Sequence, residues 1–136
     1  MADQIKMREI AKGGMSGITK PTCQVITNNE TWGEVWTQHA VRKAAGQELP
    51  RVDFERETVL FVTLGRKNTG GYSITIEEVV TREEEILVRV KTTSPAPGGF
   101  TLQALTSPFH IVAIESRNKP IRFTVDGKAH GKTGEN

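Results

Sequence analysis

Residues 58–64 have the sequence TVLFVTL, a nearly continuous run of β-branched and apolar side chains. A run of this kind favours a β-strand that is covered on both of its faces. Shorter segments follow, some alternating apolar and polar residues, with polar or Gly- and Pro-rich connections between them, as sequential hairpins require. The further strands expected are 72–80, 86–91, 100–105, 109–114 and 121–125, with weaker candidates at 5–10 and 24–27.

One helix is expected before this strand, over Asn28–Arg42. Within it Trp32, Val35, Trp36 and His39 recur at the spacing of a single helical face. Asn28, Asn29 or Thr31 can cap its amino end, and the two tryptophans are expected to anchor the helix in the core. The fold class expected is therefore α+β, with one helix packed on a largely antiparallel, curled β-sheet that is barrel- or sandwich-like.

The chain length and charge limit the classes of function. The chain has 136 residues and a formal net charge of +2, with no internal repeat and no linker. This predicts a single domain, 1–136, with a core over about 5–126 and a polar flexible tail at 127–136. The even charge distribution argues against a nucleic-acid partner, and no apolar run is long enough for membrane insertion.

Cys23 is the only cysteine, so a disulfide within the chain is excluded. The first residues contain no apolar stretch typical of a signal peptide, and polar residues precede Cys23, unlike in a lipoprotein motif. We therefore expect either a cytoplasmic protein or an exported protein whose leader has been removed.

The histidines are isolated in the sequence, and neither they nor Cys23 have the spacing of a metal site. Residues 67–72 also lack the pattern of a phosphate loop. We therefore expect no metal, no cofactor and no catalytic residue. His110 is expected to be a partly buried, hydrogen-bonded histidine. An enzymatic or small-ligand domain that uses Cys23 and His110 stays open, because such partners meet in space rather than in sequence.

Three connections between the strands are candidates for a binding surface. Residues 67–72, KNTGGY, offer exposed backbone and an aromatic side chain, and residues 94–99 combine prolines with glycines. Plain turns are the other interpretation. If 58–64 and 72–80 pair as a hairpin, the first loop lies at one end of the sheet. The candidate partner-binding residues are Asn68, Thr69, Gly70, Gly71, Tyr72, Pro97, Gly98, Gly99, Pro108 and Phe109.

Several motifs occur in a specific order along the chain. They are Trp32-x3-Trp36-x2-His39, Val52-Asp53-Phe54, Gly65-x4-Gly70-Gly71-Tyr72-Ser73, Pro95-x-Pro97-Gly98 and the stretch LTSPFHIV at 105–112. Together they resemble the PrcB-type family, bacterial domains named for a protease complex subunit, over about Val25 to Phe123. The resemblance implies an α+β domain without catalytic activity. It also implies a protein partner, a protease or its precursor, that the domain stabilises or regulates. Self-association of the chain stays open.

A fainter similarity gives an alternative mechanism. Residues 68–71, 98–99 and 107–109 are similar in order to the three loops of the chagasin-type cysteine-protease inhibitors. The first segment lacks the proline of that family, and the last lacks its arginine. The alternative is therefore direct inhibition, in which loops enter the cleft of a protease.

Overall fold

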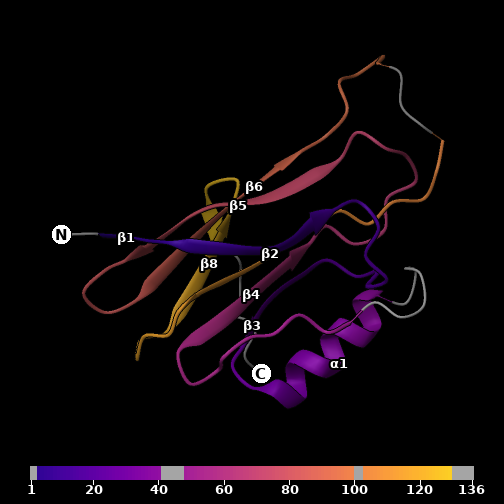
Figure 1. Ribbon diagram of the computed structural model, residues 1–136. Coiled ribbons are helices and arrows are strands. Elements are labelled where there is room, and N and C mark those ends of the chain that lie inside the picture. Colours follow the sequence, from indigo (N-terminus) through magenta and orange to yellow (C-terminus); the bar gives the residue numbers. More distant parts are fainter. Residues whose placement is uncertain (1–2, 41–47, 100–102, 130–136) are drawn as a thin grey trace.

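The computed structural model describes residues 3–40, 48–99 and 103–129. They form one helix and two β-sheets (Figure 1). The elements are β1 (Asp3–Ile5), β2 (Met7–Gly13), β3 (Thr22–Ile26), α1 (Asn29–His39), β4 (Glu57–Thr63), β5 (Ser73–Thr81), β6 (Ile86–Thr93), β7 (Phe109–Glu115), β8 (Ile121–Val125) and β9 (Lys128–Ala129).

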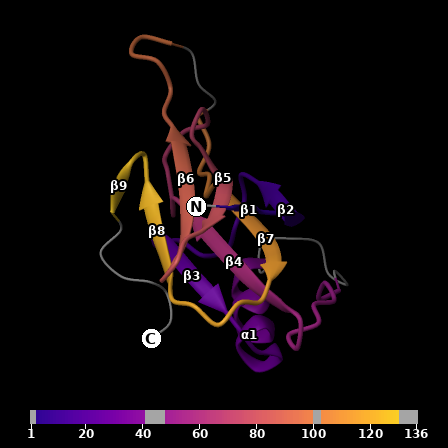
Figure 2. The same ribbon diagram turned by 90° about the vertical axis from the view of Figure 1, so that its left-hand side faces the viewer.

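The two sheets form two layers, and α1 forms a third. The five-stranded sheet has the order β1-β5-β6-β8-β9, and the four-stranded sheet has the order β2-β7-β4-β3. The pairs of these strands are antiparallel except the parallel pair of β6 and β8. Figure 1 shows α1 on the side of the four-stranded sheet that faces away from the other sheet. Figure 2 shows that the strands of the two sheets run at an angle to each other.

The core has two parts because β4 is buried on both faces. Leu60 and Val62 point into the cluster between the two sheets. Val59 and Phe61, which alternate with them, point into the cluster between the four-stranded sheet and α1. The prediction of a strand covered on both sides is confirmed.

The helix lies where its apolar spacing predicts. Asn28 caps it, since its side-chain oxygen accepts a hydrogen bond from the Thr31 backbone N–H at 2.8 Å. The buried residues of α1 are Trp32, Val35, Trp36 and His39, the expected face. The α-helix ends at His39, before the expected end at Arg42, and residues 41–42 lie outside the described residues.

The prediction of a largely antiparallel α+β fold is confirmed, but the structure does not support a curled, barrel-like sheet. Neither sheet closes on itself within the described residues, so a barrel is not supported. The hairpin of 58–64 with 72–80, which the sequence left open, does not form, because β4 pairs with β3 and β7, whereas β5 pairs with β1 and β6. Residues 64–72 cross from one sheet to the other instead.

Two further segments differ from the expectation. Residues 103–105 of the predicted strand 100–105 are not in a strand, and residues 100–102 lie outside the described residues. The predicted tail begins at 127, yet Lys128 and Ala129 form β9 against β8. A turn with positive φ at Asp126 and Gly127 (53° and 83°) makes this pairing possible. Residues 130–136 lie outside the described residues.

Candidate functional site

The three candidate loops leave the sheets at the same end of the molecule. Residues 64–72 join the end of β4 to the start of β5, residues 94–99 follow β6, and residues 103–108 precede β7. Residues 64–72 and 103–108 lie side by side on the right-hand side of Figure 1, and residues 94–99 project beyond them toward its upper right. We call this set, residues 64–72, 94–99 and 103–108, the loop end.

Two of these loops hold each other in place. The Lys67 N–H donates to the Thr106 carbonyl at 2.7 Å, and the Thr106 N–H donates back to the Lys67 carbonyl at 2.9 Å. The Thr106 hydroxyl also donates to the Thr69 carbonyl at 2.9 Å. Gly71 adopts φ 91°, a conformation that glycine accommodates without strain. Hydrogen bonds with Thr106 therefore help to hold the backbone of residues 67–71 in one shape.

Side chains on the loop end combine charge with apolar surface. The Lys67 ammonium lies 5.0 Å from the centroid of the half-buried Tyr72 ring, within cation–π range. Leu105 is 44% exposed. Met15 lies outside the loop end but forms a β-bridge with Ser107 in it, and Met15 is 43% exposed. Lys67, Leu105 and Met15 were not among the site residues predicted from the sequence. Their signal was weak, because single charged or apolar residues in loops are common.

Residues 94–99 form a separate, exposed turn at the same end. The Gly99 N–H donates to the Ala96 carbonyl at 2.9 Å, and Gly98 has φ 78°. Pro97, Gly98 and Gly99 are all exposed. The candidate residues of this loop therefore lie at the surface, as a binding role requires.

Pro108 and Phe109 do not present their side chains at the surface, contrary to the expectation of an exposed patch. Phe109 is 1% exposed, and its ring centroid lies 4.3 Å from that of His39. Pro108 is buried, and its carbonyl accepts hydrogen bonds from the Leu64 N–H and the Thr63 hydroxyl. Because side chains alternate along β7, Phe109 points toward α1. Pro108 and Phe109 are therefore part of the interior next to the loop end and not of its surface.

Cys23 and His110 do not form a dyad. Cys23 of β3 lies opposite Val62 of β4, and Val62 lies opposite His110 of β7. Two strand spacings separate the two backbones by about 10 Å. Burial raises the pKa of the Cys23 thiol to about 11, so the thiolate needed for nucleophilic chemistry is scarce at neutral pH. The alternative that uses these two residues for catalysis is therefore not supported.

His110 instead joins the two sheets. Its Nδ1 accepts a hydrogen bond from the Ile76 backbone N–H of β5 at 2.9 Å, which leaves the proton on Nε2. Nε2 then donates to the Glu9 carboxylate of β2, also at 2.9 Å. Burial lowers the pKa of His110, and the hydrogen bond with Glu9 opposes this effect. The prediction of a hydrogen-bonded histidine is confirmed, and the side chain is more fully buried than expected, at 4% exposure.

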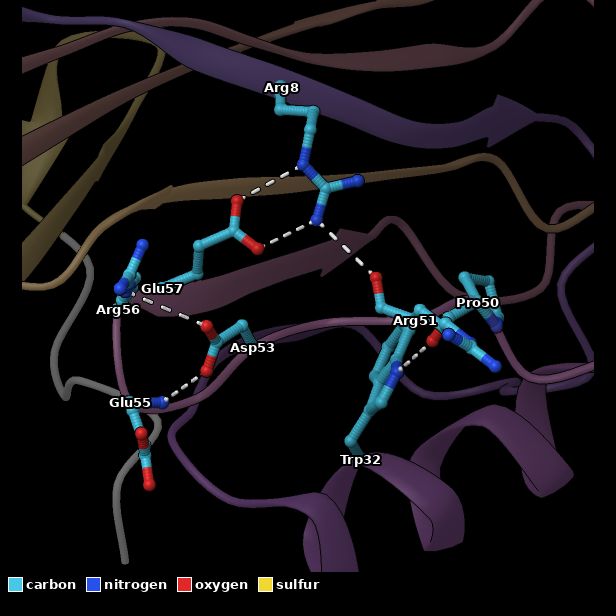
Figure 3. A network of polar contacts seen from close by, with 8 residues as sticks. All are labelled: Arg8, Trp32, Pro50, Arg51, Asp53, Glu55, Arg56 and Glu57. Atoms are coloured by element: carbon cyan, nitrogen blue, oxygen red, sulfur yellow. Dashed lines mark hydrogen bonds and ion pairs between the residues drawn. The ribbon is translucent and has the colours of Figure 1, made fainter.

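A second polar cluster lies at the opposite end of β4 (Figure 3). The Arg8 guanidinium donates to both carboxylate oxygens of Glu57 and to the Arg51 carbonyl, and it holds the pKa of Glu57 below its ordinary value. The Trp32 indole N–H donates to the Pro50 carbonyl at 2.9 Å. These contacts attach the segment before β4 to α1 and β2, which is a structural role.

Two further findings concern metals and membranes. Among the described residues, no group of three or more His, Cys, Asp or Glu side chains is placed to hold a metal ion. No helix in the same residues has the length and apolar character to cross a membrane.

Comparisons with known proteins give one match. No curated protein and no solved structure matched the chain. A family model described as PrcB C-terminal matches residues 58–115, which run from β4 to the end of β7 and include all three candidate loops. Over residues 58–115 the chain is thus similar to the PrcB C-terminal family, and the resemblance that the motifs indicated is confirmed for this part of the chain.

Proposed function

We propose that this chain is a non-catalytic subunit that binds a protease or its precursor through the loop end and stabilises or regulates it. The match to the PrcB C-terminal family supports an association with a protease complex. The observation that carries the proposal is the reciprocal pairing of Lys67 with Thr106, which joins two of the family-like motifs into one surface.

A surface held in this way is suited to binding. Binding costs less free energy when the interface residues are already ordered, because less conformational entropy is lost on association. Tyr72 supplies an aromatic body with a polar tip, and Leu105 supplies exposed apolar area. The glycines between Thr69 and Tyr72 leave backbone groups accessible to a partner.

The experiment that tests the proposal is competitive capture. The immobilised chain is exposed to an extract of the source organism, and bound proteins are identified by mass spectrometry with and without an excess of free chain. We expect a protease or its precursor among the proteins that the free chain displaces. If no protease is displaced, the proposed function is wrong.

Direct inhibition is the second candidate, favoured by the gathering of the loops at one end. The burial of Phe109 counts against it, because the third inhibitory loop then lacks its aromatic side chain. The two functions differ in the activity of the captured protease. An inhibitor lowers the initial rate of substrate cleavage, whereas a stabilising subunit leaves the initial rate unchanged and extends the lifetime of the activity.

A further inference from the structure

The outer edge of β3 differs from the other sheet edges. β1 and β9 are very short, and β2 carries Arg8, Glu9 and Lys12 and has a bulge between Glu9 and Ala11. Charges, bulges and shortness are the usual means by which proteins prevent a sheet edge from pairing with another chain. β3, with the sequence TCQVI, has no charge, no proline and an unbroken register with β4. Within the described residues, β4 is the strand that pairs with it, and its other edge is open.

Two hollows flank this open edge, one on each face. The first hollow, of about 490 Å³, lies on the α1 side of the edge. Its lining includes Lys20, which precedes β3, Thr22 of β3, and Gln38 of α1. The second, about 390 Å³, lies on the side between the sheets and is lined by Val25, Thr27 and Ile121, among others.

The two hollows lie on the two faces toward which alternate side chains of an added strand point. Thr22 and Ile26 lie on the same face of β3, the face toward α1. Val25 lies on the opposite face and packs against the core between the sheets. A residue opposite Thr22 in an added strand points toward the first hollow, and a residue opposite Val25 points toward the second. These two residues are three positions apart. Backbone pairing with pockets for alternate side chains is a known mode of peptide recognition.

The charges around the edge are mainly positive. Lys20 lies beside the first hollow, and Arg117 and Lys119 line the second. The Arg117 guanidinium pairs with the exposed Glu115 carboxylate at 3.0 Å, and the Lys119 ammonium donates to the Thr81 hydroxyl and the Arg82 backbone carbonyl. A ligand with acidic residues at its ends complements this distribution.

We propose that β3 accepts an extended acidic segment of a partner protein as an added antiparallel strand, with apolar side chains three positions apart in the two hollows. The site lies outside the loop end and does not depend on the function proposed for it.

A second copy of the chain is a poorer occupant. Antiparallel pairing of two β3 strands about Gln24 sets Lys20 of each copy beside the Thr27 region of the other. That region already holds Arg117 and Lys119, so like charges meet at both ends of the pair. Repulsion at these positions disfavours self-pairing.

The probe is a synthetic ten-residue peptide with two leucines three positions apart, threonines between them and aspartates at both ends. Two further versions of the peptide carry N-methyl groups on every second backbone amide. One version is methylated at the odd-numbered positions of the peptide and the other at the even-numbered positions. An added strand bonds to its neighbour through one set only. We expect one N-methylated version to lose at least about tenfold in affinity and the other to stay within about twofold of the parent. Equal affinities for the two versions, or no binding of the parent peptide, overturn the proposal.

Variants of the chain locate the site. Thr27 is exposed at the second hollow, and Thr27→Glu brings a negative charge and a longer side chain there. We expect at least about tenfold weaker peptide binding with an unchanged melting temperature. Thr75 lies opposite Lys91 on the outer face of the five-stranded sheet. Thr75→Glu is the matched control, and we expect it to leave peptide binding unchanged.

Two further outcomes distinguish strand addition at β3 from binding at the loop end and from self-pairing. Thr69→Arg at the loop end leaves peptide binding intact, so failure of protease capture and failure of strand addition are distinguishable. Analytical ultracentrifugation reports self-pairing. A dimer that Thr27→Glu dissociates and that the peptide does not displace overturns the proposal in favour of a second copy.

Discussion

Gly65 shows how one backbone position shapes the loop end. Its φ is +78°, and a Cβ atom there lies only 2.7 Å from the Pro21 nitrogen and 2.8 Å from the Thr19 carbonyl oxygen. The Arg66 N–H donates to the same Thr19 carbonyl at 3.0 Å. Residues 19–21 therefore pack directly on the start of the 64–72 loop, and only glycine fits at this contact.

Gly65→Ala is expected to destabilise the protein strongly. Gly98→Ala is the matched control, because Gly98 has the same φ of +78° and nothing within 4 Å of an added Cβ. The control costs about 1–2 kcal/mol for the left-handed conformation. Gly65→Ala adds the backbone clash to that cost, so its free energy of unfolding in urea falls further. Equal losses for the two variants would show that the close approach at Gly65 is absent.

His110 makes the stability dependent on pH. Its pKa in the folded protein is lowered, so the unfolded chain binds the proton more readily. Stability is therefore fully present above the unfolded pKa of about 6.5 and is lost as the pH falls below it. A proton on Nδ1 also opposes the bond from the Ile76 N–H.

The measurement is the melting temperature of the protein and of His110→Asn between about pH 7.5 and pH 5.5, a range chosen around the ordinary histidine pKa. We expect the melting temperature of the unaltered chain to fall across this range and that of His110→Asn to fall less. Parallel curves would mean that His110 does not contribute to the pH dependence.

At the level of elements, α1 is held to the four-stranded sheet chiefly by its tryptophans. Trp32 is 0% and Trp36 is 6% exposed, and their ring centroids lie 5.6 Å apart. Both belong to the cluster that includes Phe61 and Ile111 of the sheet. The helix has few other large apolar side chains, so its packing depends on these two.

Trp36→Ala is expected to reduce the free energy of unfolding by about 3–5 kcal/mol, because it removes buried area and leaves a cavity. Thr37→Ala, on the exposed side of the same helix, is the control and changes stability by less than about 0.5 kcal/mol. Chemical denaturation monitored by circular dichroism measures both. An unchanged stability of Trp36→Ala would contradict the packing of α1 on the sheet.

The sequence predicted elements better than it predicted their partners. The helix face and the double burial of β4 depend on local spacing, which is visible in the chain. The placement of β4 and β5 in different sheets depends on long-range pairing, and a short connection between two strands does not reveal it. Phe109 was misplaced for a similar reason, because the face of β7 that meets α1 is set by its register with β4.

At the scale of the whole molecule, the loop end joins segments that are far apart in the chain. Residues 67–72 and 105–108 meet through the pairing of Lys67 with Thr106, and the Thr106 hydroxyl reaches Thr69. The sequence indicated the members of this site but not their assembly, because assembly requires the strand order. The turn of residues 82–85, at the other end of the β5–β6 hairpin, has no part in it.

The most direct test of the loop end compares capture of the protease or its precursor by two arginine variants. Thr69→Arg places a long charged side chain in the paired loop. Glu83→Arg places one at an exposed position of the 82–85 turn. We expect Thr69→Arg to weaken capture at least about tenfold, or about 1.4 kcal/mol, with an unchanged melting curve, and Glu83→Arg to capture normally. Undiminished capture by a folded Thr69→Arg protein would contradict a binding role for the loop end.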